Sequence, residues 1–220
     1  MSVMLAKRLL ARLRGEESGV AAVELAYVMP LFLVLLSGGV ELVNYATAHM
    51  RISQIAVSLA DNASRAKQEV VSGVPRMREV DVNETFVAAK LQAGGIDIEQ
   101  NGRIILSSLE RNASGGQWIH WQRCFGEANY TSSYGTEGTG ATGTGMTGMG
   151  PGGREVAAEK GTAIMFVEVV YDYDAVMFGD TFKNSTIRKT AAMYVRDDRD
   201  LSGIYNPSPA ADVNDCDPSS

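Results

Sequence analysis

Apolar residues follow a helical pattern through the first third of the chain. Leu25–Val40 contains 16 residues without a charge. Farther on, apolar and polar residues recur at three- and four-residue spacing, the apolar set being Ile52, Ile55, Leu59 and Ala63. This pattern predicts one long helix from about residue 19 to residue 66, apolar in its first half and amphipathic in its second. Gly73 and Pro75 would close it.

A shorter periodic segment predicts a second helix from Asn83 to about Ala93, with Asn83 as its N-cap. Gly94 and Gly95 would end this helix. The side chains expected to point inward are Phe86, Val87 and Leu91.

The rest of the chain has the shorter periods of β-strands. Asn101-Gly102, between residues 96–100 and 103–109, is typical of a hairpin with a type I′ turn. Three further strands are expected at residues 117–125, 162–173 and 185–196. The predicted fold class is therefore α+β, with a four- or five-stranded antiparallel sheet packed against the amphipathic half of the long helix.

Residues 134–153 interrupt the strands with a glycine-rich segment. A phosphate-binding loop is disfavoured because no Gly-Lys-Ser/Thr follows the glycines. The composition favours a flexible insertion between two strands. The tail from Asn206 onward, rich in Pro, Ser, Asp and Ala, is expected to be loose except where it is tethered.

Basic residues before the apolar stretch set its orientation. Residues 1–19 contain four of them, Lys7, Arg8, Arg12 and Arg14, which places this end in the cytoplasm and the chain after about Asn44 outside it. The 16 uncharged residues span only about 24 Å, whereas residues 20–43 are long enough to cross a bilayer. A secretory signal peptide would have its cleavage site after the apolar region, but here the small residue Gly19 precedes it.

Two carboxylates fall inside this predicted span. Glu41 can lie at the far interface at little cost, but Glu24 lies near the other end, where an intramembrane carboxylate costs about 2.5–3.5 kcal/mol. Cleavage after Gly19 would create an amine at Val20 as a partner for Glu24. The alternative is that Glu24 marks the interfacial start of an ordinary signal anchor.

The stretch from Gly19-Val-Ala-Ala-Val-Glu24 through Pro30 to Gly39-Val-Glu41 resembles the N-terminal motif of the TadE-like family, pseudopilins of the tight-adherence (Flp) pilus machinery. The similarity covers residues 15–60, with Leu25 where Phe is commoner. The tail Val195–Tyr205 also resembles exported domains of such proteins.

The resemblance implies a pilin-like arrangement and a type IV prepilin signal. A prepilin peptidase would cut between Gly19 and Val20, which makes residues 1–19 a leader, residues 20–43 a transmembrane helix and residues 44–220 an exported domain. Glu24 would set subunit register by meeting the N-terminal amine of a neighbouring subunit. The implied partners are other pilins and pseudopilins, an assembly platform in the inner membrane, and the inner membrane itself.

Pro30 predicts a kink, because it removes one backbone hydrogen bond and clashes with the preceding turn. In type IV pilins, helix-breaking residues in this region accompany filament packing. A kink without function is the alternative.

The two cysteines, Cys124 and Cys216, both fall on the exported side and are expected to form a disulfide. A metal site would need more ligands than these and the two histidines, and a catalytic thiol would need a nearby base. Acidic residues at 172, 174, 197, 198 and 200 lack the spacing of a calcium loop and are interpreted as solvated rim.

The net charge of the chain argues against one further class of partner. The leader carries a net charge of +2 and the whole chain −6, which leaves −8 on the mature protein. Nucleic acid is therefore not expected as a partner. No catalytic motif, cofactor site or metal site is expected. The sequence favours a minor pilin or pseudopilin, and the alternative is a periplasmic binding or enzymatic domain tethered by an uncleaved signal anchor.

Overall fold

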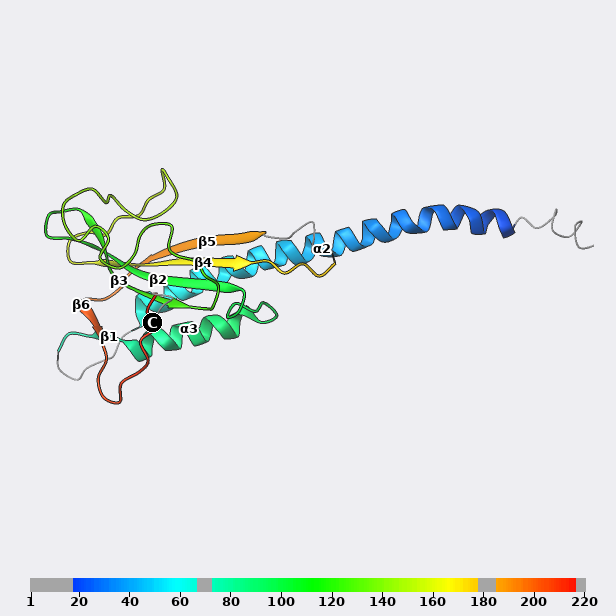
Figure 1. Cartoon of the computed structure of the whole chain (residues 1–220). Coiled ribbons are helices and arrows are strands. Elements are labelled where there is room, and N and C mark those ends of the chain that lie inside the picture. Colours follow the sequence, from blue (N-terminus) through cyan, green and yellow to red (C-terminus); the bar gives the residue numbers. More distant parts are fainter. Residues whose placement is uncertain (1–17, 67–72, 178–184, 217–220) are drawn as a thin grey trace, which may run out of the picture.

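The computed structural model describes residues 18–66, 73–177 and 185–216. Its dominant element is the helix α2, Ser18–Arg65, which is continuous over 48 residues as predicted. Figure 1 shows the first half of α2 projecting away from the other described residues, here called the globular part (residues 44–66, 73–177 and 185–216). The basic residues of the predicted leader lie outside the described residues.

The globular part is built on a four-stranded antiparallel sheet. Its strands are β2 (Gly102–Arg111), β3 (Gln117–Phe125), β4 (Ala163–Asp172) and β5 (Thr186–Tyr194), in the spatial order β3-β2-β4-β5. The α+β prediction is confirmed, and all four strands lie within two residues of the bounds predicted for them.

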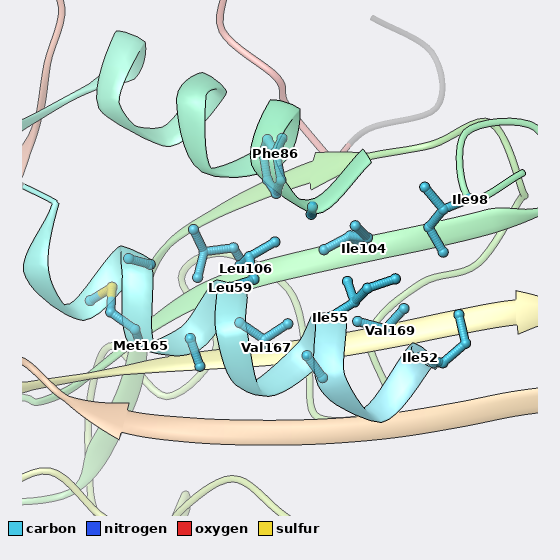
Figure 2. Close-up of a cluster of buried hydrophobic side chains, with 14 of the residues drawn as sticks. Ile52, Ile55, Leu59, Phe86, Ile98, Ile104, Leu106, Met165, Val167 and Val169 are labelled. Carbon is cyan, nitrogen blue, oxygen red and sulfur yellow. The ribbon is translucent and has the colours of Figure 1, made fainter. Parts of the chain in front are cut away.

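The main core lies between this sheet and the second half of α2. Ile52, Ile55 and Leu59 are fully buried, as their spacing predicts, against side chains of β2 and β4 (Figure 2). Phe86 of a second helix, α3, closes the core beside them. β4 is buried on both faces, which explains its long apolar run, interrupted at one buried residue, Glu168.

Helix α3, Glu79–Ala93, begins four residues earlier than predicted. Asp81 accepts a hydrogen bond from the Arg78 amide at 2.9 Å, and the carboxylates of Glu79 and Asp81 favour the positive end of the helix. The predicted cap, Asn83, lies inside the helix and instead binds the carbonyl of Asp212 at 2.9 Å. Of the side chains expected inward only Phe86 is buried, whereas Val87 and Leu91 are exposed. Gly94 follows the helix end as expected.

The predicted Asn101-Gly102 hairpin is wrong. Residues 96–100 form turns, with the Asn101 amide donating to the Asp97 carbonyl at 3.0 Å, and Gly102 begins β2. Glycine is needed at 102 because a Cβ there would lie 2.6 Å from the Ile98 carbonyl oxygen. The real β2–β3 hairpin turns at residues 112–116, where Asn112 and Gly116 are hydrogen bonded.

The glycine-rich segment is packed against the sheet, which corrects the prediction of a flexible insertion. It runs along the outer edge of β3, with the Ile119 amide donating to the Thr139 carbonyl at 2.9 Å and the Gln117 amide to Met146 at 3.0 Å. A Cβ at Gly140 would lie 2.3 Å from the Gln117 carbonyl, so this close approach requires glycine. Met149 is fully buried in a second apolar cluster on the sheet face opposite the helices.

A parallel pair of short strands, which sequence reasoning missed, closes the end of the globular part. It consists of β1 (Arg76–Arg78) and β6 (Asp200–Tyr205). Just before β6, the buried Arg199 donates hydrogen bonds to the carbonyls of Ala63, Ser64 and Ala66 at the end of α2, at 3.3, 2.5 and 2.8 Å. Its Nε donates to Asp197 at 2.9 Å. One guanidinium thereby satisfies carbonyls that a helix end leaves without intrahelical partners.

We expect Arg199→Met to lower the free energy of unfolding by about 3–5 kcal/mol, because it leaves buried backbone carbonyls without their donor and removes one partner of the Asp197 carboxylate. The matched control is Arg196→Met, which removes a half-exposed ion pair with Asp61 and should cost about 0–1 kcal/mol. Urea unfolding of the full chain in detergent, followed by the fluorescence of Trp118 and Trp121 on β3, measures both. Equal shifts for the two variants would contradict the capping role.

Candidate functional site

The projecting half of α2 is the most unusual surface of the chain. Its large apolar side chains from Val20 to Leu36 are all exposed. Among the described residues, α2 is the one helix long and apolar enough to cross a membrane, with a mean hydropathy of 2.2 in its most apolar window and none of that window buried. This surface needs an apolar environment from outside the chain.

The residues predicted for processing and register lie at the far end of this half. Gly19 and Val20 form the first turn of α2, and Glu24 follows Val20 by four residues, which places the two on one helix face. Glu24 is exposed, and Figure 1 shows this end of α2 distant from the globular part. The roles of Gly19, Val20 and Glu24 therefore stay predictions.

Pro30 lies inside α2, and the helix is continuous on both sides of it. Its missing amide leaves one carbonyl in the preceding turn without its usual intrahelical donor. About two turns after Pro30, the Ser37 hydroxyl donates to the carbonyls of Leu33 and Val34 at 2.8 and 3.1 Å, so this polar group is satisfied within the helix. Gly38 and Gly39 have open space around them, where another helix can approach closely. The kink at Pro30 stays a prediction.

The projecting half meets the globular part at Glu41. This carboxylate, expected at a membrane interface, is enclosed by protein with only 1% of the residue exposed. It accepts hydrogen bonds from the Tyr173 hydroxyl at 2.6 Å and from the Met177 amide at 2.8 Å. The ring of Tyr173 packs edge to face with Tyr45, one turn farther along α2. The loop after β4 thus fastens the globular part to the helix at this point.

Burial, and then the hydrogen bond to Glu41, raise the pKa of the Tyr173 hydroxyl well above its ordinary value. A group whose pKa is raised by folding stabilises the fold below its unfolded pKa, about 10 for tyrosine, and this contribution is lost as the pH rises through the folded value. The hydroxyl therefore remains a donor to Glu41 throughout the physiological range.

The outer face of α2, on the side away from the sheet, is also uncovered. We define it by exposed residues that alternate at four- and three-residue spacing: Gly39, Val43, Ala46, Met50, Ser53 and Val57. Helices on the surface of soluble domains normally carry charged residues outward. Here a shallow hollow of about 600 Å³ follows Met50, Ser53 and Val57 and is flanked by Gln92 of α3 and Met193 of β5. The apolar surface thus continues from the projecting half onto the globular part.

Cys124 at the end of β3 and Cys216 in the tail form a disulfide in the structure, with 92 residues of sequence separation. The tail has no regular secondary structure here, but hydrogen bonds also hold it, among them one from the Cys124 amide to the Asn214 carbonyl at 2.8 Å. Closing a loop of this length stabilises the fold by about 4–5 kcal/mol in the chain-entropy model.

Two of the acidic residues near the strand ends, Asp172 and Asp197, have structural partners. Asp172 accepts hydrogen bonds from Tyr130 and Thr186 at 2.6 and 2.8 Å, and Asp197 accepts one from Arg199. Within the described ranges, no group of three His, Cys, Asp or Glu side chains is placed to hold a metal ion. Asp172 and Asp197 thus hold the chain in place at the ends of β4 and β5.

The segment that contains the projecting half and the outer face of α2 matches a known protein family. Residues 19–61 match the TadE-like protein family. The match begins at Gly19 and covers the projecting half, the Glu41 junction and all six residues of the outer face. No curated protein and no solved structure matches the chain. The TadE-like match indicates a role in the tight-adherence pilus system and association with other pilus components. Members of this family are pilus components rather than enzymes. One long apolar helix fits a single-pass membrane anchor in such a system.

We expect Tyr173→Phe to loosen the attachment of the loop after β4 to α2 at Glu41. The buried Glu41 carboxylate loses a hydrogen-bond donor, at a cost of about 1–3 kcal/mol. Amide hydrogen exchange of Met177, which donates to the same carboxylate, should accelerate. The control is Tyr194→Phe, which removes an exposed hydroxyl bonded to the Ala157 carbonyl at 3.0 Å and lies away from Glu41. Unchanged exchange at Met177 in Tyr173→Phe would show that the hydroxyl does not hold the loop.

Proposed function

We propose that this chain is a minor pilin or pseudopilin that takes part in assembly of a tight-adherence (Flp) pilus. In this proposal a prepilin peptidase removes residues 1–19, residues 20–43 span the inner membrane, and residues 44–220 are exported. The observation that carries the proposal is the TadE-like match over residues 19–61, which starts at the glycine expected before the cut. The partners are the peptidase, other pilins and pseudopilins, and the inner-membrane assembly platform.

The outer face of α2 supports association with other pilins. Its small residues, Gly39, Ala46 and Ser53, alternate with the larger Val43, Met50 and Val57, and all six are exposed. Small residues let two helix backbones approach closely, and the larger ones supply the apolar contact area. The face crosses from the proposed span into the globular part, so one neighbouring helix can follow it through both environments.

Glu24 supports a charged contact between subunits. Its carboxylate is exposed among apolar residues, in a segment where an uncompensated charge is costly. Cleavage after Gly19 would create a positive amine on Val20, and the same amine on a neighbouring subunit can pair with Glu24 in low dielectric. Such a pair would set the axial register between helices.

The first test is the N-terminus of the mature protein. We expect the intact mass of the protein extracted from membranes to correspond to a chain that starts at Val20. Gly19→Val should reduce processing, because the small residue before the cut is lost. Retention of residues 1–19 in protein that supports piliation would contradict the proposal and favour an exported binding or enzymatic domain on an uncleaved signal anchor.

The second test isolates the charge of Glu24. Glu24→Gln keeps the side-chain shape, so this variant should insert and be cleaved normally but support few surface pili. Glu84→Gln, which changes an exposed carboxylate on α3, should leave piliation unchanged. Counting pili by electron microscopy in strains that carry only one variant measures both. Normal piliation with Glu24→Gln would reduce Glu24 to an interfacial marker.

A further inference from the structure

The loop after β4 combines a fixed position with an apolar surface. We call residues Tyr173–Met177 the junction loop. In Figure 1 this loop reaches along α2 toward its projecting half, and the two hydrogen bonds to Glu41 hold it there. Its last two residues, Val176 and Met177, are 68% and 54% exposed. Consecutive exposed apolar side chains are unusual in a loop that faces water.

The length of the projecting half gives the depth of this loop relative to a membrane. The 21 residues from Val20 to Val40 rise by about 31 Å as a helix, which matches the roughly 30 Å hydrocarbon core of a bilayer. If Val20 lies at one boundary of that core, Glu41 lies at the other. The Met177 amide is 2.8 Å from the Glu41 carboxylate, so Met177 lies at the same depth.

The surroundings of the loop fit an interfacial position. Leu42 and Val43 of α2 are exposed at the same level of the helix. The rings of Tyr45 and Tyr173 pack together beside them at 5.0 Å, and tyrosine is enriched where membranes meet water. Asp174 of the loop and Arg51 of α2 line a hollow of about 250 Å³ together with Val176, so these two charged groups lie between the loop and α2.

We propose that the junction loop rests on the bilayer, with Val176 and Met177 in the interfacial layer of the exported leaflet. The partner is a lipid surface, and the contact sets the height of the globular part above the membrane. Because Glu41 of α2 is hydrogen bonded to the junction loop, the helix and the globular part then meet the membrane as one rigid body. This inference rests on the membrane anchor of the proposed function.

The test measures the depth of single nitroxide labels in the full chain. The two cysteines are paired, so an introduced cysteine is the only free thiol in unreduced protein. We place labels at Val176 in the junction loop, at Val34 in the middle of the proposed span, and at Val74, an exposed valine next to β1 at the far end of the globular part. All three variants are Val→Cys, so the substitution itself is matched. The protein is reconstituted in vesicles of phosphatidylethanolamine and phosphatidylglycerol.

Accessibility to oxygen, which concentrates in lipid, is compared with accessibility to a water-soluble nickel chelate. We expect Val34 to favour oxygen strongly, Val74 to favour the chelate, and Val176 to shift from the Val74 value toward the Val34 value. A Val176 label as accessible to the chelate as Val74, with Val34 still in lipid, would overturn this inference and leave the anchor intact. Chelate access at Val34 would overturn the anchor itself, and the inference with it.

A third result would identify a different partner. If the Val176 label is shielded from both reagents, and dilution of the protein with lipid restores its access to the chelate, then another copy of the chain covers the loop. That outcome also overturns the lipid contact.

Discussion

The arrangement of the molecule depends on the hydrogen bonds that the Arg199 guanidinium donates to the end of α2. A helix of 48 residues ends at the globular part, and the carbonyls at this partly buried end need partners outside the helix. Arg199 binds three of them and Asp197, and it comes from the segment between β5 and β6. The chain after the sheet thus returns to close the end of the first helix, and the buried charge is compensated by both a carboxylate and the helix dipole.

Glu41 performs the corresponding task about 36 Å away along α2, where the helix leaves the globular part. Between these two buried charged residues, Ile52, Ile55 and Leu59 supply the apolar contact with the sheet. The apolar contact alone would permit small shifts of the helix along the sheet, because it is not directional. Hydrogen bonds at both ends fix the helix axially, so the direction of the projecting half follows from the fold of the globular part.

Periodicity was sufficient to predict those elements whose burial is repetitive. The spacing of Ile52, Ile55 and Leu59 predicted the buried face of α2, and alternating or continuous apolar runs predicted β3, β4 and β5. Prediction failed where a single long-range contact overrides a local signal. Asn101-Gly102 is a favourable turn sequence, but Gly102 is needed beside the Ile98 carbonyl, 2.6 Å from where its Cβ would lie. Likewise, the glycines at 134–153 suggested flexibility, because composition does not reveal that β3 offers backbone groups for them to bind.

The candidate site likewise contains features that local sequence predicts and contacts that it does not. Local sequence predicted the apolar span and the carboxylates within it, whereas the partners of Glu41 are 132 and 136 residues away along the chain and no local pattern indicates them. The comparison between the two glutamates is informative. Glu41 lies where α2 enters the globular part and receives its donors from the same chain. Glu24 is a carboxylate in the same helix, but it is exposed and lies where the globular part does not reach (Figure 1), and under the proposed function its compensating charge comes from a neighbouring subunit. The buried donors of Glu41 make it part of the fold, whereas the exposed Glu24 has a role in assembly only under the proposed function.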